Sequence, residues 1–108
     1  MGTLPPLSAQ SWNEHFTRYQ ASPEFLDTYI NYGNALLFQG RVEEAAEKYK
    51  HVLSVNNNSF DAHHNMALAL ARLGEFDPAI YHLREALRIN PTYKEARENL
   101  SKLLKLRA

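Results

Sequence analysis

Apolar residues recur along the chain at spacings of three and four positions, the pattern of helices that bury one face. Trp12, Phe16 and Tyr19 follow this spacing early in the sequence, and leucines follow it near the C-terminus. No stretch approaches the roughly 18 uninterrupted apolar residues that a membrane-spanning helix needs. The pattern therefore predicts an all-α protein without a membrane span.

The helical pattern contains an internal repeat. Residues 26–59 align without gaps on residues 60–93. The identical pairs are mostly small or apolar, as helix packing requires. They are Asp27 and Asp61, Asn31 and Asn65, Ala35 and Ala69, Leu36 and Leu70, Gly40 and Gly74, Ala45 and Ala79, Leu53 and Leu87, and Asn56 and Asn90. Each unit is long enough for two short helices and a turn.

Two of these pairs predict how each unit folds. Gly40 and Gly74 are expected to end the first helix in a left-handed conformation, which only glycine adopts without steric cost. Ala45 and Ala79 are expected where the second helix crosses the first, because a methyl side chain lets the two backbones approach closely. Each unit is therefore predicted to be a helical hairpin.

This pattern resembles the tetratricopeptide repeat family over about residues 22–106. The residues that carry the resemblance in the first unit are Tyr29, Tyr32, Gly33, Leu36, Gly40, Ala45, Tyr49 and Leu53. Those in the second unit are Met66, Ala67, Leu70, Gly74, Phe76, Ala79, Leu83, Ala86, Leu87 and Pro91. Val52 and Asn57 depart from the family pattern at positions that Ala86 and Pro91 satisfy. The resemblance implies antiparallel hairpins stacked into a right-handed α-solenoid.

Residues typical of helix starts support this division. Ser22-Pro23-Glu24 begins one helix, and Asp77-Pro78 is expected to supply an N-cap followed by proline in the first helical position. Thr92 and Glu95 are expected to form a capping box before a further helix.

The organisation expected is a flexible tail at residues 1–10 and a degenerate preceding-repeat helix at 11–21. Repeats follow at 22–59 and 60–93, and a capping helix at 94–108. This makes about six helices. Aromatic residues are expected to pack the N-terminal junction: Trp12, Phe16, Phe25, Tyr29 and Tyr32.

Composition narrows the function by exclusion. Twelve Lys and Arg balance twelve Asp and Glu, so no net charge draws the chain to nucleic acid. The absence of cysteine excludes disulfides, thiolate zinc sites and a cysteine nucleophile. It leaves the compartment open, and the sequence carries no targeting signal that would name one.

Metal binding and catalysis find no support in the sequence. His63 and His64 are adjacent, so on a helix they diverge by about 100° and cannot share one ion. His63 is expected to pack inward and His64 to face a groove. No phosphate-binding loop, nucleophile elbow or framed carboxylate pair is present. We expect no enzyme activity, no cofactor and no metal.

The resemblance implies that the first helix of each repeat lines a concave groove that binds peptide. The residues carried onto that groove are Asp27, Ile30, Asn31, Asn34, Leu37 and Phe38, then Asp61, His64, Asn65, Leu68 and Arg72, then Glu95, Glu98, Asn99, Lys102 and Lys105.

Two uses of such a groove differ in the side chains that they need. A carboxylate clamp for chaperone tails is disfavoured, because its basic positions fall on Ile30, Glu95 and Asn99. Asn31, Asn65 and Asn99 recur at the same position of successive units, which is similar to the asparagine ladder of O-linked N-acetylglucosamine transferase. Their amides would read a peptide backbone. The alternative is that these asparagines cap or pack between helices.

The function expected is a non-enzymatic scaffold that binds a protein or peptide partner in its groove, without nucleic acid. One alternative is a homodimer, or contact with further repeats of the same parent chain, through the C-terminal helix with Leu103, Leu104 and Leu106. Another is a regulatory repeat segment of a larger enzyme.

Overall fold

A computed structural model describes residues 18, 19 and 21–107 of the chain. Its described part contains five helices and no strand. They are α2 (Pro23–Phe38), α3 (Val42–Val55), α4 (Phe60–Arg72), α5 (Phe76–Ile89) and α6 (Lys94–Arg107). The predicted all-α class is confirmed. The additional helix predicted over residues 11–21 lies mostly outside the described residues.

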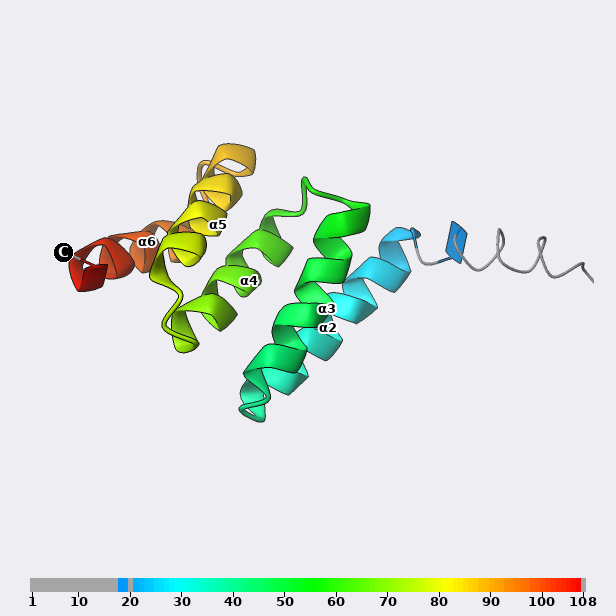
Figure 1. Ribbon diagram of the computed structural model, residues 1–108. Helices are drawn as coiled ribbons and strands as arrows, with labels where there is room; N and C mark the ends of the chain where they lie inside the picture. The colour runs from blue at the N-terminus through cyan, green and yellow to red at the C-terminus, as the bar shows by residue number, and fades with distance from the viewer. Residues whose placement is uncertain (1–17, 20, 108) are drawn as a thin grey trace, which may run out of the picture.

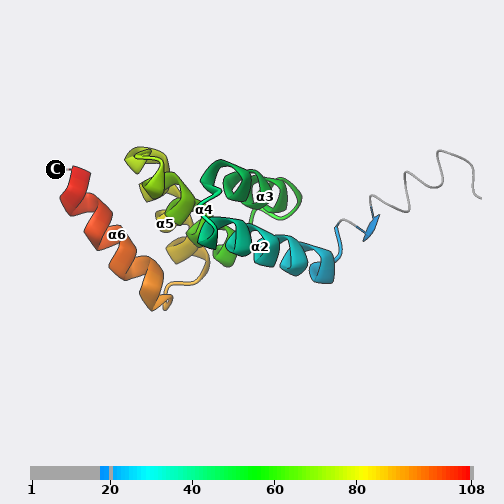
Figure 2. The ribbon, with the colours of Figure 1, turned by 90° about the horizontal axis from the view of Figure 1, so that it is seen from below.

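The helices form a row of antiparallel hairpins (Figure 1). Helices α2 and α3 form the first hairpin, α4 and α5 form the second, and α6 packs beside α5 at the C-terminal end. The same row is visible from below (Figure 2), and the molecule measures 64 × 28 × 21 Å along its principal axes. This elongated arrangement is a helical repeat solenoid, as predicted.

Both hairpin turns use the same glycine conformation. Gly40 has φ 81° and Gly74 has φ 78°, the left-handed region expected from the sequence. The N–H of Gly40 donates to the carbonyl of Leu37, and the N–H of Arg41 donates to that of Leu36. The turn at Gly74 forms the equivalent pair of bonds. These bonds satisfy carbonyls left free at the end of the first helix, which is the Schellman arrangement.

Serine side chains cap the first helix of each hairpin. Ser22 Oγ accepts a hydrogen bond from the N–H of Phe25 at 3.2 Å, with Pro23 in the first helical position as predicted. Ser59 Oγ accepts from the N–H of Ala62 at 3.2 Å. Each cap satisfies one of the N–H groups that a helix start leaves without an intrahelical partner.

The N-cap predicted at Asp77 and the capping box predicted at Thr92 are wrong, although α6 does begin at Lys94. Helix α5 begins two residues earlier than expected, directly after the Gly74 turn, so Asp77 and Pro78 lie inside its first turn. The early start places the half-buried Phe76 against the second core cluster. The hydroxyl of Thr92 donates to Asn90 Oδ1 at 3.0 Å within the preceding turn instead of capping α6.

The buried core consists of two clusters joined through α4. The first contains residues of α2 and α3 with Ala62 and Ala69, and the second contains residues of α5 and α6 with Ala67. Ala45 and Ala79 are completely buried, as their predicted place at the helix crossings requires. Small residues on α4 let α2 and α3 of the first hairpin, and α5 and α6, pack closely against it.

Aromatic rings pack along the N-terminal part of α2, as predicted for the residues described there. The rings of Phe25 and Tyr29 stack with centroids 5.2 Å apart, and Tyr29 meets Tyr32 edge-on at 6.2 Å. Tyr19 contacts Phe25 edge-on at 5.2 Å. Trp12 and Phe16, which were expected in the same junction, lie outside the described residues.

Candidate functional site

The residues predicted for the groove lie on α2, α4 and α6, the first helices of the successive units. Most are exposed or half-buried. These are Asp27, Asn31, Asn34, Phe38, Asp61, Asn65, Leu68, Arg72, Glu95, Glu98, Asn99, Lys102 and Lys105. We call the side chains in this set the first-helix surface.

Three of the predicted groove residues are buried. Leu37 and His64 are each 7% exposed, and Ile30 is 9% exposed. Leu37 packs in the first core cluster because the α2 helix turns its apolar stripe toward α3 and α4. The expectation that Leu37 and His64 face a partner is therefore wrong. Ile30 also packs in this cluster, but it lines a pocket as well.

His64 joins α4 to the segment that enters α6. Its Nδ1 lies 3.0 Å from the hydroxyl of Tyr93, and its Nε2 lies 3.0 Å from Nδ2 of Asn99. Because the Asn99 amide nitrogen can only donate, Nε2 is the acceptor and Nδ1–H donates to Tyr93. Burial lowers the pKa of His64, although nearby Glu95 and Asp61 oppose this shift. The neutral imidazole thus has both ring nitrogens bonded.

The three asparagines of the predicted ladder differ in their surroundings. Asn31 is exposed and Asn65 is half-buried, whereas Asn99 is half-buried with its amide nitrogen on His64. For Asn99 the packing alternative holds, because its amide N–H₂ group bonds His64 inside the protein. Asn31 carries the most exposed amide of the three, whereas Asn65 is half-buried beside His64.

Asn34 and Arg72 also serve the fold. The hydroxyl of Tyr49 donates to Asn34 Oδ1 at 2.6 Å, and burial raises the pKa of Tyr49 to about 12. Arg72 Nη1 donates to the carbonyl of Leu37 at 2.8 Å. The last turn of α2 has no basic residue of its own, so Arg72 brings a cation from α4 to the negative end of the α2 dipole.

Acidic side chains recur at one register of the first-helix surface. Asp27, Asp61 and Glu95 occupy the same position of successive units, and all three are exposed. The ion pairs found among the described residues include none of the three. Their carboxylates are therefore available to a cationic partner.

His63 of α4 and His82 of α5 form a partly buried contact that serves the fold. His63 is 1% exposed, as predicted, and its Nε2 donates to the carbonyl of Asn57 at 2.8 Å. Its Nδ1 consequently accepts from Nδ1 of His82 at 2.9 Å. Burial lowers the pKa of His82 to about 4. Within the described ranges, no cluster of three or more His, Asp or Glu side chains could hold a metal ion.

Two pockets border the first-helix surface. One of about 170 Å³ lies between α4, α5 and α6 and is lined by Ala67, Leu68, Ala71, Leu83, Asn99, Lys102, Leu103 and Leu106. The other, of about 320 Å³, lies where α2, α3 and the start of α4 meet. Only part of each lining was predicted from sequence. The second helices and turns supply the rest, and the carry-over of groove residues considered only the first helices.

The stacked hairpins and the polar surface along their first helices define an α-helical repeat protein. Comparison with family models then identifies the repeat: a model described as TPR repeat matches residues 33–74, and one described as Tetratricopeptide repeat matches residues 60–93. The chain belongs to the tetratricopeptide repeat family, as its sequence predicted.

Repeats of this family generally mediate protein–protein interactions, and the family is typically a non-catalytic scaffold. Its domains bind protein partners. A search of curated proteins found no match to the chain. None of the helices in the described part is long and apolar enough to cross a membrane.

Proposed function

We propose that the chain is a non-enzymatic scaffold that binds an extended peptide segment of a partner protein along its first-helix surface. The observation that carries this proposal is the row of exposed or half-buried polar side chains at one register of α2 and α4. Asp27 and Asn31 lie on α2, and Asp61 and Asn65 occupy the same positions on α4. Each side-chain amide can donate to a carbonyl and accept from an N–H of the same peptide backbone.

Peptides selected from a random displayed library against the purified chain would test the proposal. We expect the selected peptides to bind Asn31→Ala/Asn65→Ala more weakly than the unmodified chain. Each lost amide contact contributes about 0.5–1.5 kcal/mol net, so the pair should cost about 1–3 kcal/mol, or roughly 5- to 150-fold in affinity. The urea midpoint should stay within experimental error, because neither side chain is buried.

Lys50→Ala is the control, since Lys50 is exposed on α3, a second helix, and belongs neither to the first-helix surface nor to the linings of the two pockets. Its affinity for the selected peptides should equal that of the unmodified chain. Equal affinity of the double variant would show that the peptides bind elsewhere and would reject the proposal. A large loss of stability in the double variant would instead support the packing role of these asparagines.

Self-association through α6 is the competing candidate. Leu106 is 66% exposed, which favours it, but Leu103 is 7% exposed and Leu104 is half-buried. Of the three leucines that the sequence suggested for self-association, only Leu106 is therefore exposed. Peptide binding along the first-helix surface is the better supported proposal.

A further inference from the structure

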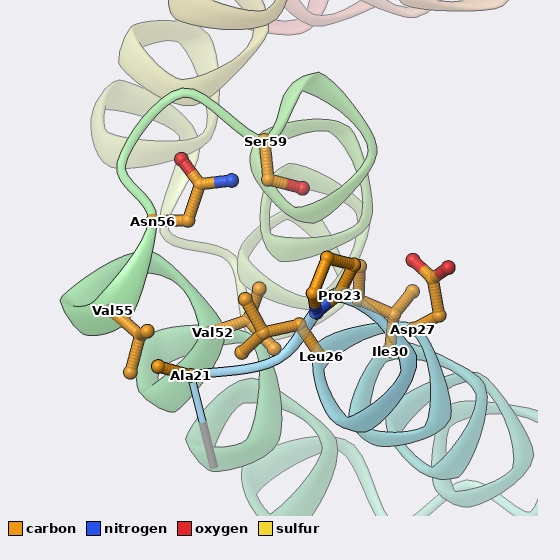
Figure 3. A pocket seen from close by; sticks show the side chains of 9 residues that line it. All are labelled: Ala21, Pro23, Leu26, Asp27, Ile30, Val52, Val55, Asn56 and Ser59. Atoms are coloured by element: carbon orange, nitrogen blue, oxygen red, sulfur yellow. The ribbon is translucent and has the colours of Figure 1, made fainter. Parts of the chain in front are cut away.

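The larger pocket lies at one end of the first-helix surface, where the start of α2, the end of α3 and the start of α4 meet (Figure 3). Its volume of about 320 Å³ is near the lower end of the roughly 300–1,000 Å³ typical of ligand pockets. Its lining combines apolar side chains with the polar side chains of Asp27, Asn56 and Ser59. The lining residues are Ala21, Pro23, Leu26, Asp27, Ile30, Val52, Val55, Asn56 and Ser59.

The second repeat fills the equivalent position with its own side chain. Tyr93 is the counterpart of Ser59, and its ring meets those of Phe60 and His64 at 5.4 and 4.8 Å between centroids. Its hydroxyl bonds His64. Phe60 and His64 are the counterparts of Leu26 and Ile30, which line the pocket in the first repeat. An aromatic side chain therefore covers this position in one repeat but not in the other.

Ser59 cannot play the part of Tyr93. Its side chain is short, and its Oγ bonds the N–H of Ala62 at the start of α4. Ile30 also replaces the imidazole of His64 with an aliphatic side chain, so the floor of the pocket is more apolar than its counterpart. A large apolar ring inserted here would gain the burial that Tyr93 gains in the second repeat.

We infer that this pocket receives an aromatic side chain from the partner polypeptide, in the manner of Tyr93 in the second repeat. The inference rests on the proposed function and specifies an anchor residue for it. Asp27 on the rim adds a charge requirement, because Asp27 and Asp61 present exposed carboxylates along the same surface. The partner segment therefore carries Lys or Arg beside its aromatic anchor.

Short capped peptides provide the probe. N-acetyl-Lys-Tyr-amide and N-acetyl-Glu-Tyr-amide would be titrated into the isotope-labelled chain while backbone amide shifts are followed by NMR. We expect saturable shifts at residues lining the pocket, with the lysine peptide bound about 1.5- to 5-fold more tightly, as for an exposed ion pair. Asp27→Asn should remove most of this preference without abolishing binding.

Two reciprocal variants test the internal comparison. Ser59→Tyr installs the residue of the second repeat, so it should fill the pocket and abolish the shifts. Tyr93→Ser should open the equivalent position and add a second set of shifts around Phe60. If circular dichroism shows that Ser59→Tyr does not fold, Val55→Trp offers another block at the rim, since Val55 is 41% exposed.

The outcomes separate this inference from the general proposal. Asn31→Ala/Asn65→Ala should leave probe binding unchanged, because neither residue lines the pocket. No saturable shifts at the pocket, or shifts that survive both blocking variants, would overturn the inference while leaving peptide binding elsewhere on the surface intact. Binding that appears only in Trp12→Ala/Phe16→Ala would show that the chain's own aromatics occupy the pocket, which also overturns it.

Discussion

Gly33 and Tyr49 are matched in size across the first hairpin: a Cβ on Gly33 would lie 2.6 Å from Cε1 of Tyr49. Tyr49 is completely buried, so its ring has no open space to enter. In the second hairpin the corresponding residues are Ala67 and Leu83, both also completely buried. The first repeat thus packs a small Gly33 against a large Tyr49, and the second packs a larger Ala67 against a smaller Leu83. Enlarging one residue of a pair therefore requires a smaller partner.

Gly33→Ala should destabilise the chain by about 1–3 kcal/mol, because overpacking outweighs the roughly 0.5–1 kcal/mol that alanine gains over glycine in a helix. Chemical denaturation measures the change. The same substitution in a Tyr49→Leu background should cost less, since that background restores the pair of the second repeat. An equal cost in both backgrounds would contradict a direct steric coupling.

Ala79→Leu should overpack the second hairpin and lower its stability by about 1–3 kcal/mol. Ala79 is completely buried where α5 crosses α4, so the extra carbons have to displace backbone or neighbouring side chains. Ala35→Leu is the matched control on α2, because Ala35 is exposed. An unchanged denaturation midpoint for Ala79→Leu would contradict the close helix crossing.

Acid should weaken the fold through two histidines. The pKa of His64 and that of His82 are both lowered in the folded chain, His82 to about 4 from 6.5. The unfolded chain therefore binds more protons in this range, so stability is fully present above pH 6.5 and is lost as pH falls toward 4. Protonating His64 at Nε2 would also break its bond from Asn99.

Urea midpoints measured across this pH range should fall with acidification. The combined variant His64→Leu/His82→Leu should show a shallower fall than the unmodified chain. If the combined variant kept the full slope, other groups would be responsible for the acid sensitivity.

The chain should not self-associate through α6. Stable protein interfaces bury about 800 Å² on each partner, and α6 offers Leu106 as its one large apolar side chain that is more than half exposed. Light scattering at high concentration should give the same mass for the unmodified chain and for Leu106→Glu. A dimer that Leu106→Glu dissociates would revive self-association through α6.

The hairpins could be predicted from the sequence because the residues that determine their turns and helix starts lie close together along the chain. Gly40 and Gly74 mark both turns, and Ser22 with Pro23 marks the first helix. Asp77-Pro78 misled because a residue pair typical of a helix start also fits inside the first turn of a helix. What decided the start of α5 was the preceding turn, which returns the chain directly into a helix.

The surface was harder to predict because its residues are paired by contacts between repeats. His64 has the register of a groove residue, yet Tyr93 and Asn99 cover it from beyond α5. Arg72, another predicted groove residue on α4, donates a hydrogen bond to the carbonyl of Leu37 in the preceding hairpin. A period fixes which positions are equivalent, but Ser59 and Tyr93 show that equivalent positions need not be filled alike.

The division of the core into two clusters that share α4 has a consequence for how binding would be felt along the chain. The first cluster is built mainly from α2 and α3 and the second from α5 and α6. In such a linear array, stabilisation passes only between neighbours. A ligand seated against α2 and α3 should slow hydrogen exchange strongly in the first hairpin, less in α4, and scarcely in α6. Hydrogen exchange at each end of this elongated molecule would then show whether a ligand is bound at that end.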